Sequence, residues 1–61
     1  MKTNLRFVMV HGIKFTVWSD IILRGTFAEF NGEVKAIRTS GYLSNPASVK
    51  RAIKSAFINL F

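Results

Sequence analysis

The side chains that could carry out catalysis are few in this 61-residue chain. It has one histidine, His11, three carboxylates, Asp20, Glu29 and Glu33, and no cysteine. General acid–base catalysis needs a positioned proton carrier, and a structural zinc or calcium site needs several ligands of these types together. Only His11 could activate a serine or threonine hydroxyl. We therefore predict a protein that is not an enzyme, binds no metal and needs no cofactor.

Basic side chains dominate the chemistry that remains. Nine Lys and Arg against three acids give a net charge of +6 and a pI near 10.6. This imbalance indicates a polyanionic partner, either nucleic acid or an anionic membrane surface. No apolar run approaches the roughly 20 residues of a membrane span, and charged residues interrupt any signal-peptide core. The absence of cysteine suits a reducing compartment, so we expect a cytoplasmic protein.

The length of the chain limits it to a single domain, residues 1–61. A chain of this size buries only about 60% of the surface that its unfolded form exposes, so disulfides, a metal or a partner subunit usually support the fold. Without cysteines or metal ligands, oligomerisation remains, and 49% of the residues are hydrophobic. We expect a homodimer.

Residues 4–19 predict a β-hairpin, because they are rich in β-branched and aromatic residues around one turn signal, His11-Gly12. A two-residue turn there pairs Val10 with Ile13, Val8 with Phe15 and Arg6 with Val17. One face then carries Val8, Val10, Ile13, Phe15 and Val17, and the other carries Leu5, Phe7, Met9, Lys14, Thr16 and Trp18. Both faces are mostly apolar, so a helix can cover one while the other meets a partner chain or bases.

A second hairpin is predicted around Asn31-Gly32, the strongest short hairpin signal. Its strands are expected over 21–30 and about 33–39. The pairing sets Phe27 opposite Ala36 and Glu29 opposite Val34. One side then carries Ile21, Leu23, Phe27, Val34 and Ala36, and the other carries Arg24, Thr26, Phe30, Lys35 and Ile37.

A helix is predicted from Asn45-Pro46 onward, after a break at Gly41, because Asn caps helices and proline suits the first helical position. Apolar residues then recur at spacings of three and four, at Val49, Ala52, Ile53, Ala56, Phe57 and Leu60. The apolar end of this helix favours packing against a symmetry mate. The fold class is therefore α+β, a curved four-stranded antiparallel sheet followed by one C-terminal helix.

The chain resembles the single-strand-binding core of the transcriptional coactivator positive cofactor four, whose fold is related to that of the Whirly proteins. The resemblance rests on three segments: LRFVMV at 5–10, ILRGTFAEFNGEVK at 22–35 and IRTSGYLSNP at 37–46. It implies a homodimer formed through the helices, with curved sheets that hold single strands or melted duplex. The family's Ser- and Lys-rich amino-terminal region has no counterpart here, so we expect a phage or bacterial member.

The resemblance also implies a set of site residues. The matched positions are Lys14, Arg24, Phe27, Lys35 and Arg38 for nucleic acid, with Phe27 in place of a base-stacking tryptophan. Phe15 or Trp18 takes a second stacking role, and the alignment leaves both open. The implied interface consists of Val49, Ile53, Ala56, Phe57 and Leu60.

Three functions follow from these observations. The leading one is sequence-tolerant binding of single-stranded DNA by a homodimer, in replication, recombination or transcription, with the machinery of these processes as a further partner. The second is a duplex-DNA reader that places a sheet in the major groove, as integrase arm domains do. The third is a protein or membrane interaction through the basic helix 46–61. For each aromatic residue, core packing is the competing interpretation, and for each cation it is a solvated strand face.

Overall fold

Four strands and one α-helix make up the computed structural model, which describes residues 2–39 and 46–61. The strands are β1 (Lys2–Val10), β2 (Ile13–Asp20), β3 (Gly25–Phe30) and β4 (Glu33–Ile37). The helix α1 (Pro46–Ala56) is followed by a short 3-10 helix, η1 (Ile58–Leu60). The predicted α+β class and the β-β-β-β-α order are confirmed. The predicted break at Gly41 and cap at Asn45 lie outside the described residues.

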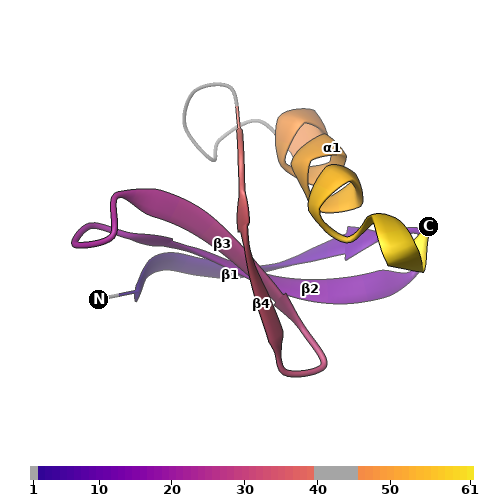
Figure 1. Cartoon of the computed structure of the whole chain (residues 1–61), viewed down its shortest axis with the longest axis horizontal. Coiled ribbons are helices and arrows are strands. Elements are labelled where there is room, and N and C mark those ends of the chain that lie inside the picture. The colour runs from indigo at the N-terminus through magenta and orange to yellow at the C-terminus, as the bar shows by residue number, and fades with distance from the viewer. Residues whose placement is uncertain (1, 40–45) are drawn as a thin grey trace.

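The strands form one antiparallel sheet in the order β1-β2-β3-β4, so each strand pairs with its neighbour in sequence. The helix lies on one side of this sheet and contacts both edge strands, β1 and β4 (Figure 1). The chain's C-terminal end lies beside the β1–β2 turn, where the rings of His11 and Phe61 are 5.5 Å apart. The other side of the sheet, which we call the open face, has no element packed on it among the described residues.

Both hairpin registers follow the predicted pairing. In the first hairpin Val8 lies opposite Phe15, and in the second Phe27 lies opposite Ala36. The turn residues have positive φ angles: 50° at His11, 78° at Gly12, 53° at Asn31 and 84° at Gly32. Two consecutive residues of positive φ match the right-handed twist of the strands they join. This local geometry explains why the registers could be predicted.

The third strand begins later than predicted, at Gly25 instead of residue 21. The carboxylate of Asp20 ends β2 by accepting hydrogen bonds from the backbone N–H groups of Ile22, at 2.9 Å, and Leu23, at 3.0 Å. A side chain that bonds the backbone two and three residues ahead forms a turn. Residues 21–24 are therefore a turn, and Arg24 adopts φ 54° there. The predicted strand over 33–39 ends at Ile37.

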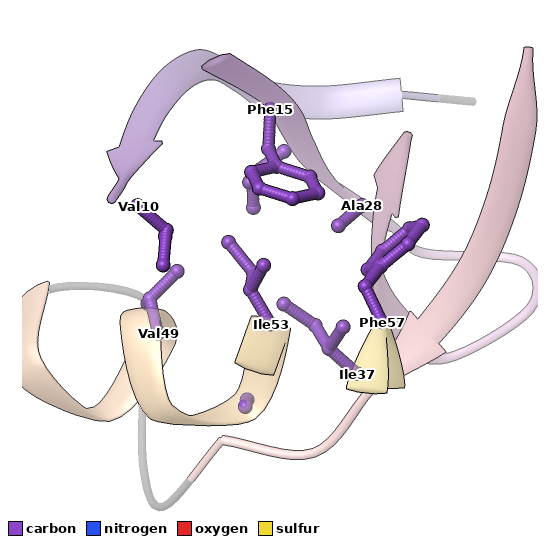
Figure 2. Packing of buried hydrophobic residues seen from close by; sticks show 9 residues of the cluster. Val10, Phe15, Ala28, Ile37, Val49, Ile53 and Phe57 are labelled. Carbon is purple, nitrogen blue, oxygen red and sulfur yellow. The ribbon is translucent and has the colours of Figure 1, made fainter. Parts of the chain in front are cut away.

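The core lies between α1 and the sheet (Figure 2). The side chains of Val10, Phe15 and Ile37 point from the sheet toward Val49 and Ile53 of the helix. Each such fully buried apolar side chain contributes about 1.5–3 kcal/mol. The full set of buried residues in this cluster is Val10, Phe15, Val17, Ala28, Ile37, Val49, Ala52, Ile53 and Phe57.

This packing corrects the predicted dimer interface. Val49, Ile53 and Phe57 are buried against the sheet of their own chain and present no surface to a second copy. Ala56 is partly buried, and Leu60 is exposed. The apolar stripe of the helix is used within the chain because the sheet offers it a complementary apolar face.

Candidate nucleic-acid interface

The open face is lined by side chains that alternate with those of the core along each strand. Strand β1 supplies three exposed apolar residues to it, Leu5, Phe7 and Met9. The remaining strands add Lys14, Thr16, Trp18, Phe27, Glu29, Val34 and Ala36. Single-strand binders stack bases on aromatic side chains beside cations, and this face presents both.

Phe7 and Lys14 form the most accessible aromatic and cationic pair on this face. The Phe7 side chain is 63% exposed, and the Lys14 ammonium lies 4.1 Å from the centroid of its ring. The two residues come from adjacent strands, since Phe7 pairs with Thr16 and Met9 with Lys14. An exposed ring can stack on a base while the neighbouring ammonium neutralises a phosphate.

Trp18 and Phe27 form a second aromatic pair on the open face. They lie directly opposite each other on β2 and β3, with ring centroids 6.1 Å apart and planes inclined by 25°. The ammonium of Lys2 lies 4.2 Å from the Trp18 ring centroid. Trp18 is only 5% exposed, whereas Phe27 is half-buried. Trp18 therefore supports the surface beneath Phe27 and is not itself a free stacking platform.

The turn after β2 places one cation at the end of the open face. Arg24 is exposed there, next to Ile21, Ile22 and Leu23, which are also exposed. The Asp20 carboxylate accepts hydrogen bonds from the backbone N–H groups of Leu23 and Ile22. These bonds lower the pKa of Asp20, and the bond from Leu23 has the larger effect. Asp20 therefore remains charged and holds the turn that carries Arg24.

Two predicted site residues lie on the helix side of the sheet. Phe15 is 0% exposed, and its ring lies 5.0 Å from that of Phe57 and 5.5 Å from that of Phe30. The prediction that Phe15 stacks on a base is wrong for this structure, because the helix covers the ring. The alternative at this position, Trp18, lies on the open face but is nearly buried.

Lys35 is the second of these residues. Its ammonium donates a hydrogen bond to the Ala56 carbonyl oxygen at 3.1 Å and lies 3.1 Å from a Glu33 carboxylate oxygen. It also lies 5.3 Å from the Phe57 ring centroid. Lys35 thus faces away from Phe27, so these two residues of the site that the resemblance implied do not share a surface. The reason is strand alternation, because Lys35 pairs with the core residue Ala28 and shares its face.

Arg38 follows β4 and is exposed beside the helix. It lines a groove of about 390 Å³ together with Ser48, Arg51, Ala52 and Ser55. Of the predicted cations, Lys14 alone lies on the open face beside an exposed aromatic ring; Arg24 stands at its end, and Lys35 and Arg38 lie elsewhere.

The residue that the predicted site lacked is Phe7. Its signal was present in the sequence, since alternation places Leu5, Phe7 and Met9 on the hairpin face opposite Phe15. The resemblance includes Phe7 in the segment 5–10 but gives it no role in the site. A second groove, of about 290 Å³, runs between β1 and the start of α1 and is lined by Arg6, Phe7, Val8, Met9, Pro46, Val49 and Lys50.

Within residues 2–39 and 46–61, no group of three His, Cys, Asp or Glu side chains is placed to hold a metal ion. Among the same residues, no helix has the length and apolar character to cross a membrane.

Comparison of the chain with protein-family models, with curated proteins and with solved structures found no match.

Proposed function

We propose that this protein binds single-stranded DNA without strong sequence preference, through the open face of its sheet. The observation that carries the proposal is the exposed Phe7 ring beside the Lys14 ammonium, 4.1 Å away, on a face with no covering element. Stacking on an aromatic ring is tolerant of sequence and contributes about 1–3 kcal/mol per base.

The charge of the chain supports a polyanionic ligand. The net charge is +6, and three cations stand on or at the end of the open face: Lys2, Lys14 and Arg24. Each cation that neutralises a phosphate of a single strand contributes about −0.7 to the slope of log affinity against log salt. Three such contacts give a slope of about −2.

The apolar character of the open face favours single strands over duplex. A duplex presents phosphates and base edges, and its stacked bases cannot meet Leu5, Phe7 or Met9. An unpaired base can stack on the Phe7 ring and pack against Leu5 and Met9. The protein would act where single strands are exposed, in replication, recombination or transcription, and we place it in the cytoplasm.

The homodimer remains part of the proposal, with a different interface. The exposed apolar residues of the C-terminal segment are Ile58, Leu60 and Phe61, and only Leu60 belongs to the predicted interface. Sedimentation equilibrium of the wild type and of Leu60→Asp tests this assignment. A wild type that stays monomeric at micromolar concentration would rule the dimer out.

The binding proposal is tested with Phe7→Ala and the matched variant Val34→Ala. Val34 is another exposed apolar residue of the open face, on the far edge strand β4. Fluorescence anisotropy with labelled oligo-dT should show about 5- to 150-fold weaker binding for Phe7→Ala, the equivalent of one lost stacking contact. Val34→Ala should change affinity less than about twofold, and both variants should melt close to the wild type.

The same titration with duplex DNA and with anionic liposomes separates the competing functions. Tighter binding to duplex than to oligo-dT across the salt range would replace the proposal with a duplex reader. Binding to liposomes alone would indicate a membrane-surface protein. Equal effects of Phe7→Ala and Val34→Ala would remove Phe7 from the site.

A further inference from the structure

We propose that Arg38 and Arg51 form a second phosphate-binding site, which lets one chain hold two separate segments of nucleic acid. The site is the groove of about 390 Å³ between the end of β4 and the flank of α1. An adjoining groove of about 260 Å³ shares Arg38, Ala52 and Ser55 and extends along β4 to Ala36. The identity of the ligand as nucleic acid rests on the proposed function.

The side of α1 that lines this groove leaves room for a ligand to approach. Ser48, Arg51 and Ser55 recur at spacings of three and four, so they lie on one side of α1, with the small side chain of Ala52 among them. Small side chains leave the groove open between the two arginines. Arg38 and Arg51 themselves are exposed and can rotate into it.

The side chains that line the groove favour an anionic ligand. Two guanidinium groups provide planar forks of N–H donors that match phosphate oxygens, and the Ser55 hydroxyl adds a further donor. Neither groove is lined by a carboxylate. The three acids of the chain are engaged or placed elsewhere: Asp20 and Glu29 bond backbone N–H groups in turns, and Glu33 pairs with Lys35.

The position of this groove separates it from the open-face site. Phe7 lies on β1 and the arginine groove follows β4, the opposite edge of a sheet ordered β1-β2-β3-β4. Three strand spacings amount to about 14 Å, and the groove opens on the helix side. A strand stacked on Phe7 therefore leaves the arginine groove available for another segment.

The experiment measures bridging between two oligonucleotides. Two non-complementary oligo-dT-based strands, one labelled with a donor and one with an acceptor dye, are mixed with limiting Leu60→Asp protein, in which a dimer with two open faces cannot join them. Leu60→Asp with the arginine groove intact should produce energy transfer between them. Arg38→Gln/Arg51→Gln on this background should lose the transfer, should still bind one labelled strand, and should reduce the salt slope of total binding by about 1.4, the equivalent of two phosphates.

The control variant is Lys54→Gln, compared with Arg51→Gln, because Lys54 is an exposed helix residue that lines neither this groove nor the groove of Phe7. It should retain the transfer. Persistent bridging in Arg38→Gln/Arg51→Gln on the Leu60→Asp background would overturn the proposal. Absence of bridging by Leu60→Asp with the arginine groove intact, or an equal loss in the control, would also overturn it.

Failure of the proposed function gives a different result. If Phe7→Ala leaves oligo-dT binding unchanged while Arg38→Gln/Arg51→Gln abolishes it, the arginine groove is the phosphate site and the open face is not a binding surface. If wild type binds no oligo-dT at all, both proposals fail together.

Discussion

The ammonium group of Lys35 donates a hydrogen bond of 3.1 Å to the carbonyl oxygen of Ala56, the last residue of α1. The last four carbonyl groups of a helix have no partner within it, and a cation at that end also meets the negative pole of the helix dipole. Lys35 belongs to β4, so this bond ties the end of the helix to the edge of the sheet. A lysine that the resemblance assigns to nucleic-acid binding thus stabilises the fold.

Replacing Lys35 by methionine should lower the free energy of unfolding by about 1 kcal/mol, because the helix end loses a charged donor that is partly screened by solvent. In a domain of this size the melting temperature should fall by about 4–8 °C. Urea denaturation and thermal melts measure both quantities.

Lys50→Met is the matched control, since Lys50 is an exposed helix lysine far from this carbonyl. Its melting temperature should stay within a degree or two of the wild type. Equal destabilisation by the two substitutions would mean that the bond to Ala56 contributes nothing.

The predicted site residues lie on two different faces of the sheet, and this result shows how much of the structure could be predicted from the sequence. The registers of both hairpins were predictable because His11-Gly12 and Asn31-Gly32 restrict the turn geometry locally. The prediction that Lys35 and Ile37 share one face of the sheet followed from the alternation of side chains along a strand. The pairing of β2 with β3 did not follow, because it depends on where Asp20 ends β2 and where Gly25 starts β3.

Missing information about distant pairing also explains why the dimer interface was predicted on the buried stripe of the helix. Apolar spacing correctly grouped Val49, Ile53 and Phe57 on one stripe, but spacing does not say what the stripe packs against. The answer depends on which sheet face is covered, and both faces of the first hairpin are apolar. The structure places Phe15 on the covered face and Phe7 on the open one.

Phe15→Leu should destabilise the fold by roughly 1–2 kcal/mol, because the fully buried ring packs against Phe57 and Phe30. The identical substitution at Phe7, whose ring is mostly exposed, should change stability by no more than about 0.5 kcal/mol. Paired urea titrations measure the difference. If Phe7→Leu proved the more destabilising change, the assignment of covered and open faces would be reversed.

The single tryptophan reports on the open face. Because Trp18 is nearly buried under Phe27 and Lys2, its fluorescence should be blue-shifted and weakly quenched by acrylamide. Phe27→Ala should expose the indole, shift the emission to the red and raise the quenching constant. Val34→Ala, on the same face but opposite Glu29 and not opposite Phe27, should leave the spectrum unchanged. A wild-type spectrum typical of free tryptophan in water would contradict this placement.

Acid titration should single out Asp20. Its folded pKa lies below the ordinary value of about 3.9, because the N–H groups of Leu23 and Ile22 bond the ionised form. A lowered folded pKa adds stability above the unfolded pKa, and that stability is lost as the pH falls through the folded pKa. The effect therefore lies below about pH 4.

Carbon-13 NMR of the Asp20 carboxyl measures the midpoint directly, and it should fall below that of a model aspartate. Asp20→Asn keeps an oxygen acceptor but does not titrate, so its stability should change less than that of the wild type between pH 5 and pH 3. A midpoint at or above the ordinary value would show that the turn bonds do not favour the charged carboxylate.

The element order has a consequence for the protein while it folds. All four strands precede α1 in the chain, and residues 46–61 supply four of the nine residues of the buried cluster: Val49, Ala52, Ile53 and Phe57. Before residues 46–61 pack onto the sheet, the two hairpins can already form, because their turns and pairings are local. At that moment the newly formed sheet presents apolar side chains on both of its sides, Phe15 and Val17 as well as Phe7 and Met9. Such an unfinished sheet is the form of the chain that is most exposed to aggregation and to capture by chaperones, and completing the last helix leaves only the open face uncovered.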